Sequence, residues 1–194
     1  MKKTFISTSE LTYAAMFIAL MAVGANMAAI VTIGSVPLTF QTVVAVLAGV
    51  TLGKKVGTFS MLGYILLGFT GAPVFAGFSN GFAAIASPTF GFIISFLFIA
   101  FFSGLILEKT NNKTKSAFFA AGFVGLLFNY GIGVPYVYFY TFFILGVTDA
   151  SITAISLGMV PFFIKDTILV FLAASLAAQL HARRIIRPSL QKAV

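Results

Sequence analysis

Cysteine is absent from this sequence, and charged side chains are scarce. The chain has 194 residues with no cysteine, and only 8% of them are Asp, Glu, Lys or Arg. Without thiols, neither disulfide bonds nor thiolate chemistry can take part in its function. Soluble domains carry about 25% charged residues, so this chain has too few charges to cover a surface that faces water.

Apolar residues dominate the composition. Hydrophobic residues make up 60% of the chain, and apolar runs of about twenty residues are long enough to cross a hydrocarbon core of about 30 Å. The runs do not alternate as strands would, so we predict helices. The predicted fold is all-α, a polytopic membrane protein with a single domain, residues 1–194, and six transmembrane helices. The crossings are placed at residues 11–33, 37–52, 56–71, 88–108, 116–135 and 161–181, and the end of the fifth within 136–160 stays open.

The basic residues are concentrated on one side of these crossings. Of the 12 Lys and Arg residues, all but Lys165 lie near the chain ends or in the loops after the second and fourth crossings. They are Lys2, Lys3, Lys54, Lys55, Lys109, Lys113, Lys115, Arg183, Arg184, Arg187 and Lys192. The loops near 34–36, 72–87 and 145–160 hold none, so the positive-inside rule predicts that both termini are cytoplasmic. Topology and attraction to the lipid bilayer therefore explain the net charge of +8, without a nucleic-acid partner.

Lys165 and Asp166 stand together at the start of the last crossing. Ionisable residues inside a membrane segment are costly and usually face a polar cavity, which makes Asp166 the main candidate for binding a ligand. The alternative is a structural ion pair with a snorkelling lysine. Because neighbours on a helix point about 100° apart, we do not expect these two residues to serve one ligand from one face.

The segment Gly77-Phe78-Ser79-Asn80-Gly81 matches the G-x-S-x-G turn of serine hydrolases. A serine nucleophile needs a base within hydrogen-bond reach, and the single histidine, His181, is predicted at the other side of the membrane. A dyad with Lys165 would need a neutral lysine, which the neighbouring Asp166 opposes. A membrane-embedded hydrolase that uses Ser79 is therefore the less favoured hypothesis, and we predict that the chain is not an enzyme.

The loop that carries this pattern is apolar and rich in glycine and proline. Such a loop is expected to fold back over the helices rather than extend into water. Asn80 supplies both hydrogen-bond donors and an acceptor. We therefore predict a lid over a small-molecule pocket with apolar walls and a few polar groups.

Several motifs occur in order along the chain. They are Val36-Pro37-Leu38-Thr39-x-Gln41-Thr42, Ala48-Gly49-x-x-Leu52-Gly53, Tyr64-x-Leu66-Leu67-Gly68, Gly71-x-Pro73-Val74-Phe75-Ala76, Pro88-Thr89-x-Gly91-Phe92, Tyr130-x-x-Gly133 and Pro161-Phe162-x-x-x-Asp166. Together they cover most of the chain and resemble the BioY family, the biotin-binding S-components of energy-coupling-factor (ECF) transporters.

The resemblance implies a multi-pass protein of a prokaryotic cell membrane that binds biotin from outside and needs no metal or cofactor. Its implied partners are a transmembrane coupling protein (EcfT) and two ATP-binding subunits, which fits the lack of a G-x-x-x-x-G-K-[ST] motif in this sequence. Ala15 and Ala19 match the family's A-x-x-x-A pattern, which implies contact with the coupling protein. The alternative for these two alanines is packing against another helix of the same chain.

The resemblance also implies which residues hold the ligand. Asn80 and Asp166 would bind the ureido ring of biotin, which offers two N–H donors and a carbonyl acceptor. The other implied or candidate wall residues are Thr39, Gln41, Phe75, Phe90, Phe92 and Lys165. Where the family commonly has a lysine three residues after the aspartate, this chain has Leu169. Either Lys165 replaces that cation, or the site has none on that face.

This departure keeps other functions open. The chain could be an S-component for another small vitamin, or a solitary transporter that needs no ATP-driven module. A structural or assembly protein of the membrane without a ligand is a further alternative. These hypotheses differ in whether Asp166 is needed for ligand uptake.

Overall fold

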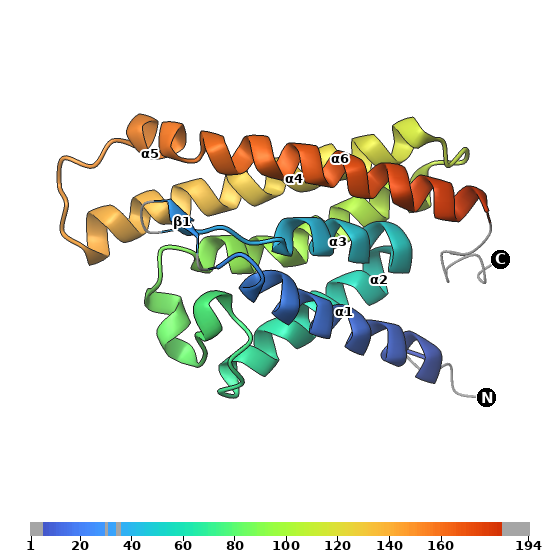
Figure 1. Cartoon of the computed structure of the whole chain (residues 1–194), viewed down its shortest axis with the longest axis horizontal. Coiled ribbons are helices and arrows are strands. Elements are labelled where there is room, and N and C mark those ends of the chain that lie inside the picture. Colours follow the sequence, from blue (N-terminus) through green and yellow to red (C-terminus); the bar gives the residue numbers. More distant parts are fainter. Residues whose placement is uncertain (1–5, 30, 34–35, 184–194) are drawn as a thin grey trace.

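The structure is a computed structural model and describes residues 6–29, 31–33 and 36–183. Most of them are helical, and the longer helices pack side by side (Figure 1). The helices are α1 (Thr8–Asn26), α2 (Gln41–Phe69), α3 (Phe90–Lys109), α4 (Lys115–Phe139), α5 (Ile152–Gly158) and α6 (Val160–Ala182). Five of them, all except α5, are long and apolar enough to cross a membrane. The prediction of an all-helical membrane protein is confirmed at this level.

Non-α segments connect the helices at the end of the bundle opposite the α3–α4 connection. The strands β1 (Thr32–Ile33) and β2 (Val36–Pro37) pair antiparallel between α1 and α2, with Thr32 opposite Pro37. Two 3-10 turns, η1 (Ala76–Phe78) and η2 (Phe82–Ala86), lie in the loop between α2 and α3. A π-helical turn, η3 (Tyr140–Ile144), ends α4.

One predicted helix boundary is wrong, and the structure places another that the sequence left open. The first crossing was expected to reach residue 33, but α1 ends at Asn26, and the paired strands follow. The stretch 136–160 is not one continuation of the fifth crossing, because η3 ends that helix and the separate α5 precedes α6. Since α6 begins at Val160, Asp166 lies about two turns from its start.

Gly53 breaks α2 into two arms that correspond to the predicted crossings 37–52 and 56–71. Its backbone angles, φ 81° and ψ 170°, are non-helical and are adopted readily only by glycine. A Cβ atom on Gly57 would lie 2.8 Å from the carbonyl oxygen of Ala48, which shows that the arms fold toward each other. The chain therefore reverses direction at Gly53, between the two arms of α2 (Figure 1).

Glu108 stabilises the start of the second arm. The backbone N–H of Lys54 donates to Glu108 Oε1 at 2.9 Å, and Lys54 Nζ lies 3.0 Å from Oε2. The first N–H groups of a helix lack intrahelical partners, so the carboxylate supplies an acceptor where the break creates this need. The bond also joins the end of α3 to the bend in α2.

Glycine allows α2 and α3 to approach closely. A Cβ atom on Gly49 would collide with the backbone of Ala100, and one on Gly104 would collide with the backbone of Lys54. Backbone atoms cannot rotate away as a flexible side chain can. This contact therefore requires the absence of a side chain at both positions.

We expect Gly49→Ala to lower the free energy of unfolding by about 1–3 kcal/mol, the usual cost of overpacking. Gly131→Ala in α4 is the matched control, since no atom lies within 4 Å of its added methyl group. Thermal unfolding of both variants in detergent measures the difference. Equal melting temperatures for the two variants would contradict the close contact of α2 with α3.

Candidate functional site

A small cavity lies among four helices and the segment before α2. It contains about 530 Å³ of empty space, including its opening to solvent. Its wall comes from α2, α3, α4 and α6, the extended residues 36–39 and the loop 70–89. The lining residues are Val36, Pro37, Thr39, Gln41, Thr42, Ala76, Thr89, Phe92, Ile93, Phe96, Asn129, Tyr130, Met159, Phe162, Lys165 and Asp166.

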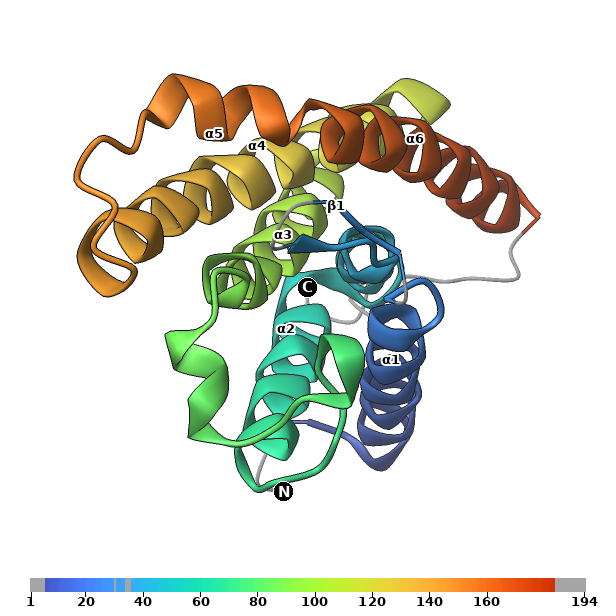
Figure 2. The same ribbon diagram turned by 60° about the vertical axis from the view of Figure 1, so that its left-hand side comes forward.

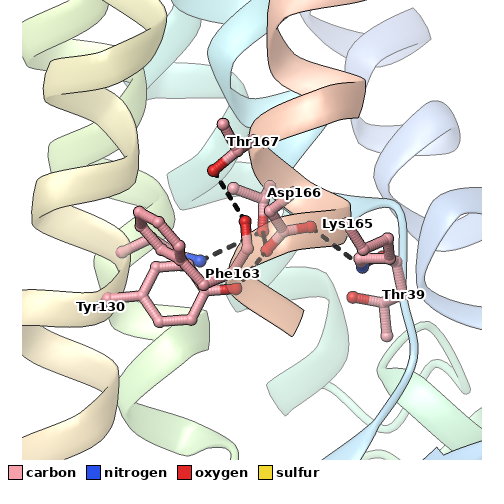
Figure 3. Close-up of polar contacts among 8 residues, drawn as sticks. Thr39, Tyr130, Phe163, Lys165, Asp166 and Thr167 are labelled. Carbon is pink, nitrogen blue, oxygen red and sulfur yellow. Dashed lines mark hydrogen bonds and ion pairs between the residues drawn. The ribbon is translucent and has the colours of Figure 1, made fainter. Parts of the chain in front are cut away.

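Asp166 is the centre of the polar part of this wall. Its side chain is buried, and its Oδ2 accepts hydrogen bonds from Thr42 Oγ1 at 3.1 Å and from the hydroxyl of Tyr130 at 2.8 Å. Lys165 Nζ lies 2.9 Å from Oδ1 (Figure 3). Burying a carboxylate is costly unless it is paired and hydrogen-bonded. The cavity wall supplies both kinds of partner.

The expectation that Lys165 and Asp166 do not serve one ligand from one face stays a prediction. Both line the cavity, because the long side chain of Lys165 bends back toward its neighbour (Figure 3). Its ammonium also donates to the backbone carbonyl oxygen of Thr39. The ion pair of the alternative hypothesis therefore exists, and it forms part of the cavity wall.

A second buried group, Asn129, extends the polar network. It is 2% exposed; its Nδ2 donates to Thr42 Oγ1 at 3.2 Å, and its Oδ1 accepts from Ser95 Oγ at 2.9 Å. Because the Thr42 oxygen accepts from Asn129, its own proton is directed toward Asp166. The chain Ser95–Asn129–Thr42–Asp166 thus joins α3, α4, α2 and α6, and each member fixes the orientation of the next.

Gln41 connects the cavity with the loop 70–89. Its Nε2 donates to the hydroxyl of Tyr64 at 2.8 Å, and that hydroxyl donates to the carbonyl oxygen of Val74 at 3.0 Å. Gln41 is also one of the residues that line the cavity. The Gln41 amide is thus held through its nitrogen by the hydroxyl of Tyr64.

The structure brings five of the predicted ligand residues to the cavity. They are Thr39, Gln41, Phe92, Lys165 and Asp166. Phe75 is buried instead against Tyr64, with ring centroids 5.5 Å apart, and Phe90 packs against Tyr136 at 5.8 Å. Neither ring lines the cavity.

Asn80 lies away from the cavity wall. Its side chain is exposed in the loop, and the loop residues that line the cavity are Ala76 and Thr89. A direct contact of Asn80 with a ligand therefore requires the loop to move. Its predicted role stays a prediction.

Four polar residues of the cavity wall were missed in the sequence: Thr42, Thr89, Asn129 and Tyr130. Thr42, Thr89 and Tyr130 belong to the motifs quoted above, but those motifs do not show which of their residues line a cavity. Asn129 carried a clearer signal, because an amide inside an otherwise apolar crossing must find a hydrogen-bond partner. The same reasoning that selected Asp166 would have selected it.

Ser79 has no catalytic environment in the described part of the chain. It is exposed, and its hydroxyl donates to the carbonyl oxygen of Ala76 at 2.9 Å within its own turn. His181 lies in the last turn of α6 with its ring 5.9 Å from that of Phe118, whereas the cavity lies near the first turns of that helix. The G-x-S-x-G pattern is thus a structural turn rich in glycine.

Ala15 and Ala19 lie on the outer face of α1. Both are exposed, whereas Ala14 is fully buried against the second arm of α2. The two alanines therefore do not pack into the bundle. They leave a smooth strip on α1 that is available to another helix.

The bundle and its cavity define a class: a membrane-embedded helical protein with a small cavity among its helices, part of whose wall is polar. The chain belongs to the BioY family, whose family model matches residues 1–185.

Individual relatives agree with this assignment. The "Probable biotin transporter BioY" of Pyrococcus horikoshii is 38% identical over 91% of this chain and 98% of its own length. The "Biotin transporter BioY" of Thermotoga maritima is 37% identical over 92% of this chain and 99% of its own. A crystal structure of the S-component for biotin from an ECF-type ABC transporter superimposes with a TM-score of 0.68 and 25% identity, covering 90% of this chain and 91% of the other. These relatives are transporters, in agreement with the expectation that the chain is not an enzyme.

Proposed function

We propose that this chain is the biotin-binding S-component of an ECF transporter. It captures biotin at the outer face of a prokaryotic cell membrane, and a coupling protein with two ATP-binding subunits drives uptake. The observation that carries the proposal is the buried carboxylate of Asp166, held by Thr42 and Tyr130 in the wall of the cavity among α2, α3, α4 and α6. The names of the relatives supply the ligand.

The proposed topology has six crossings with both termini in the cytoplasm. It counts the two arms of α2 separately, which the reversal of the chain at Gly53 supports. The bend at Gly53, the α3–α4 connection, the start of α1 and the end of α6 lie toward one end of the bundle (Figure 1). Most of the described basic residues lie there, as the positive-inside rule requires. Lys2, Lys3, Arg184, Arg187 and Lys192 lie outside the described residues.

The polar wall has the chemistry that a ureido ring needs. The ring has two N–H donors, which a carboxylate accepts strongly, and a carbonyl oxygen, which an amide, hydroxyl or ammonium group can bind. Asp166 supplies the acceptor, and Asn129 and Lys165, which have more than one N–H each, lie beside it as donors. Phe92 and the other apolar residues then surround the ring system and chain of the ligand.

Lys165 takes the place of the cation that the family commonly has three residues after the aspartate. Leu169 occupies that position here and is not part of the cavity wall, whereas Lys165 lines it. The long side chain of Lys165 reaches the carboxylate of Asp166 from the preceding position of α6. We propose that this ammonium also attracts the carboxylate of biotin.

Equilibrium binding of labelled biotin to the purified chain in detergent tests the proposal. We expect saturable binding that unlabelled biotin displaces and that riboflavin or thiamine does not. Displacement by one of those vitamins instead would favour another S-component ligand, and lack of saturable biotin binding would contradict the proposal. Ser79→Ala should bind biotin within about threefold of the parent chain, because its exposed hydroxyl contacts only its own turn.

Tyr130→Phe should weaken biotin binding by about tenfold. The change removes the hydroxyl that donates to Asp166 at 2.8 Å, and a hydrogen bond to a charged group contributes about 1.5 kcal/mol or more. Tyr138→Phe on the same helix is the control, since Tyr138 is not part of the cavity wall. Isothermal titration of both variants measures the ratio, and equal affinities would exclude a role for the Tyr130 hydroxyl.

A further inference from the structure

Asn26, the last residue of α1, is hydrogen-bonded to the loop 70–89. Its Oδ1 accepts from the backbone N–H of Phe78 at 2.8 Å, while its Nδ2 donates to the carbonyl oxygen of Ala22 at 3.0 Å. The bond to α1 orients the amide so that its oxygen is directed to the loop. Figure 2 shows the loop running past α1 and α2, with η1 in contact with α1.

The turn that Asn26 contacts has an unfavourable backbone conformation. Gly77 has φ 68° and Phe78 has φ 57°, the left-handed region that glycine adopts freely and phenylalanine rarely adopts. Such a residue persists only where its surroundings fix it. The Phe78 side chain is 68% exposed, so packing of its ring does not fix the turn. Two bonds within the loop close the turn, from the Phe75 N–H to the Ser79 carbonyl oxygen at 3.1 Å and from Ser79 Oγ to the Ala76 carbonyl oxygen at 2.9 Å. The bond from the Phe78 N–H to Asn26 ties this turn to α1.

This turn lies beside the cavity. Ala76, two residues before Phe78, lines the cavity wall. Tyr64 and Tyr136 hold the two sides of the loop, since their hydroxyls donate to loop carbonyl oxygens at 3.0 and 2.5 Å. These two anchors come from α2 and α4. The bond from Asn26 adds an anchor from α1 at the turn between them.

We infer that Asn26 is a positioning residue, which ties the left-handed turn at Gly77–Phe78 to α1 and thereby holds the loop 70–89 closed against the cavity. Loss of this bond lets the turn relax and the loop open more often. Where the cavity holds a ligand, more frequent opening speeds ligand release. That last step depends on the proposed function, whereas the effect on the loop does not.

The lack of native cysteine permits a test of the loop without any ligand. Ala84 is a loop residue that is 6% exposed and not part of the cavity wall, so Ala84→Cys places a single buried thiol in the loop. We expect a water-soluble maleimide to label this thiol about fivefold faster after Asn26→Leu, as the loss of a hydrogen bond of ordinary strength predicts. Biotin should dissociate faster from Asn26→Leu by a similar factor, with its association rate little changed.

Phe78→Asn provides the matched rescue, because asparagine enters the left-handed region more readily than phenylalanine. Added to Asn26→Leu, it should restore slow labelling of Cys at position 84. Labelling of the Asn26→Leu chain at the parent rate would overturn the inference, and so would a failure of Phe78→Asn to slow the reaction. Fast labelling with rescue, but without biotin binding in any form of the chain, would support the role of Asn26 in the loop and contradict the proposed ligand.

Discussion

Asp166→Asn should remove biotin binding at concentrations that saturate the parent chain. The exchange keeps the size of the side chain but removes the charge that accepts from Thr42 and Tyr130 and that pairs with Lys165. Loss of one partner from a buried, hydrogen-bonded charge pair costs about 2–5 kcal/mol, which corresponds to a loss of affinity of about 30-fold to several thousandfold. Titration with labelled biotin measures the loss.

Thr167→Val is the matched control for this exchange. Thr167 is the next residue of α6, and its hydroxyl donates to the carbonyl oxygen of Phe163 within the helix (Figure 3). We expect Thr167→Val to bind biotin like the parent chain. Affinity of Asp166→Asn within about threefold of the parent chain, a change of less than about 1 kcal/mol, would exclude Asp166 from the ligand site. A melting curve for each variant separates loss of the site from loss of the fold.

The sequence was sufficient for the helices and for the charged part of the site. Long apolar runs and the placement of basic residues are strong signals, because lipid tolerates few unpaired polar groups. A carboxylate in an apolar crossing is equally rare, so Asp166 could be recognised without coordinates. The break at Gly53 was predicted as well, as the gap between crossings 37–52 and 56–71, since two lysines follow it in the middle of an apolar stretch.

The direction of individual side chains was not predictable in the same way. Phe75 immediately precedes Ala76, which lines the cavity, yet its ring fills the space over Gly68, where an added Cβ atom would collide with it. Asn80 belongs to the same loop, and its exposure depends on the left-handed turn at Gly77–Phe78. One residue of difference in such a turn decides whether a side chain faces the cavity or water. The sequence therefore predicts where the loop lies, but not which of its side chains face the cavity.

The side chain of Lys165 was also not predictable from the helical angle. That angle argued against one ligand being served from one face, but a lysine side chain is long enough to bring its ammonium to the carboxylate of its neighbour. Lys165 contacts its neighbour Asp166 and the backbone carbonyl oxygen of Thr39. The second contact depends on the extended segment before α2 lying beside α6, which the sequence does not show. Long side chains thus weaken arguments based on the helical face alone.

Asn129→Leu should lower the affinity for biotin by about 10- to 100-fold. The exchange keeps the number and branching of the side-chain heavy atoms but removes the donor to Thr42 and the acceptor of Ser95. A buried polar group that loses its partner costs about 1–3 kcal/mol, and the hydroxyl of Thr42 is then free to turn away from Asp166. Since the exchanged side chain lines the cavity, a direct contact with the ligand would add to the loss.

A parallel titration of Asn80→Ala shows which of the two asparagines contributes more to the affinity for biotin. Asn80 is exposed and outside the cavity wall, so we expect a smaller loss of affinity for Asn80→Ala than for Asn129→Leu. The association rate tells how Asn80 acts, because a residue that meets the ligand only when the loop moves affects the rates of binding and release rather than the preformed site. A larger loss for Asn80→Ala would mean that the bound loop brings Asn80 into the cavity, and that the amide of Asn129 is a structural support for Thr42.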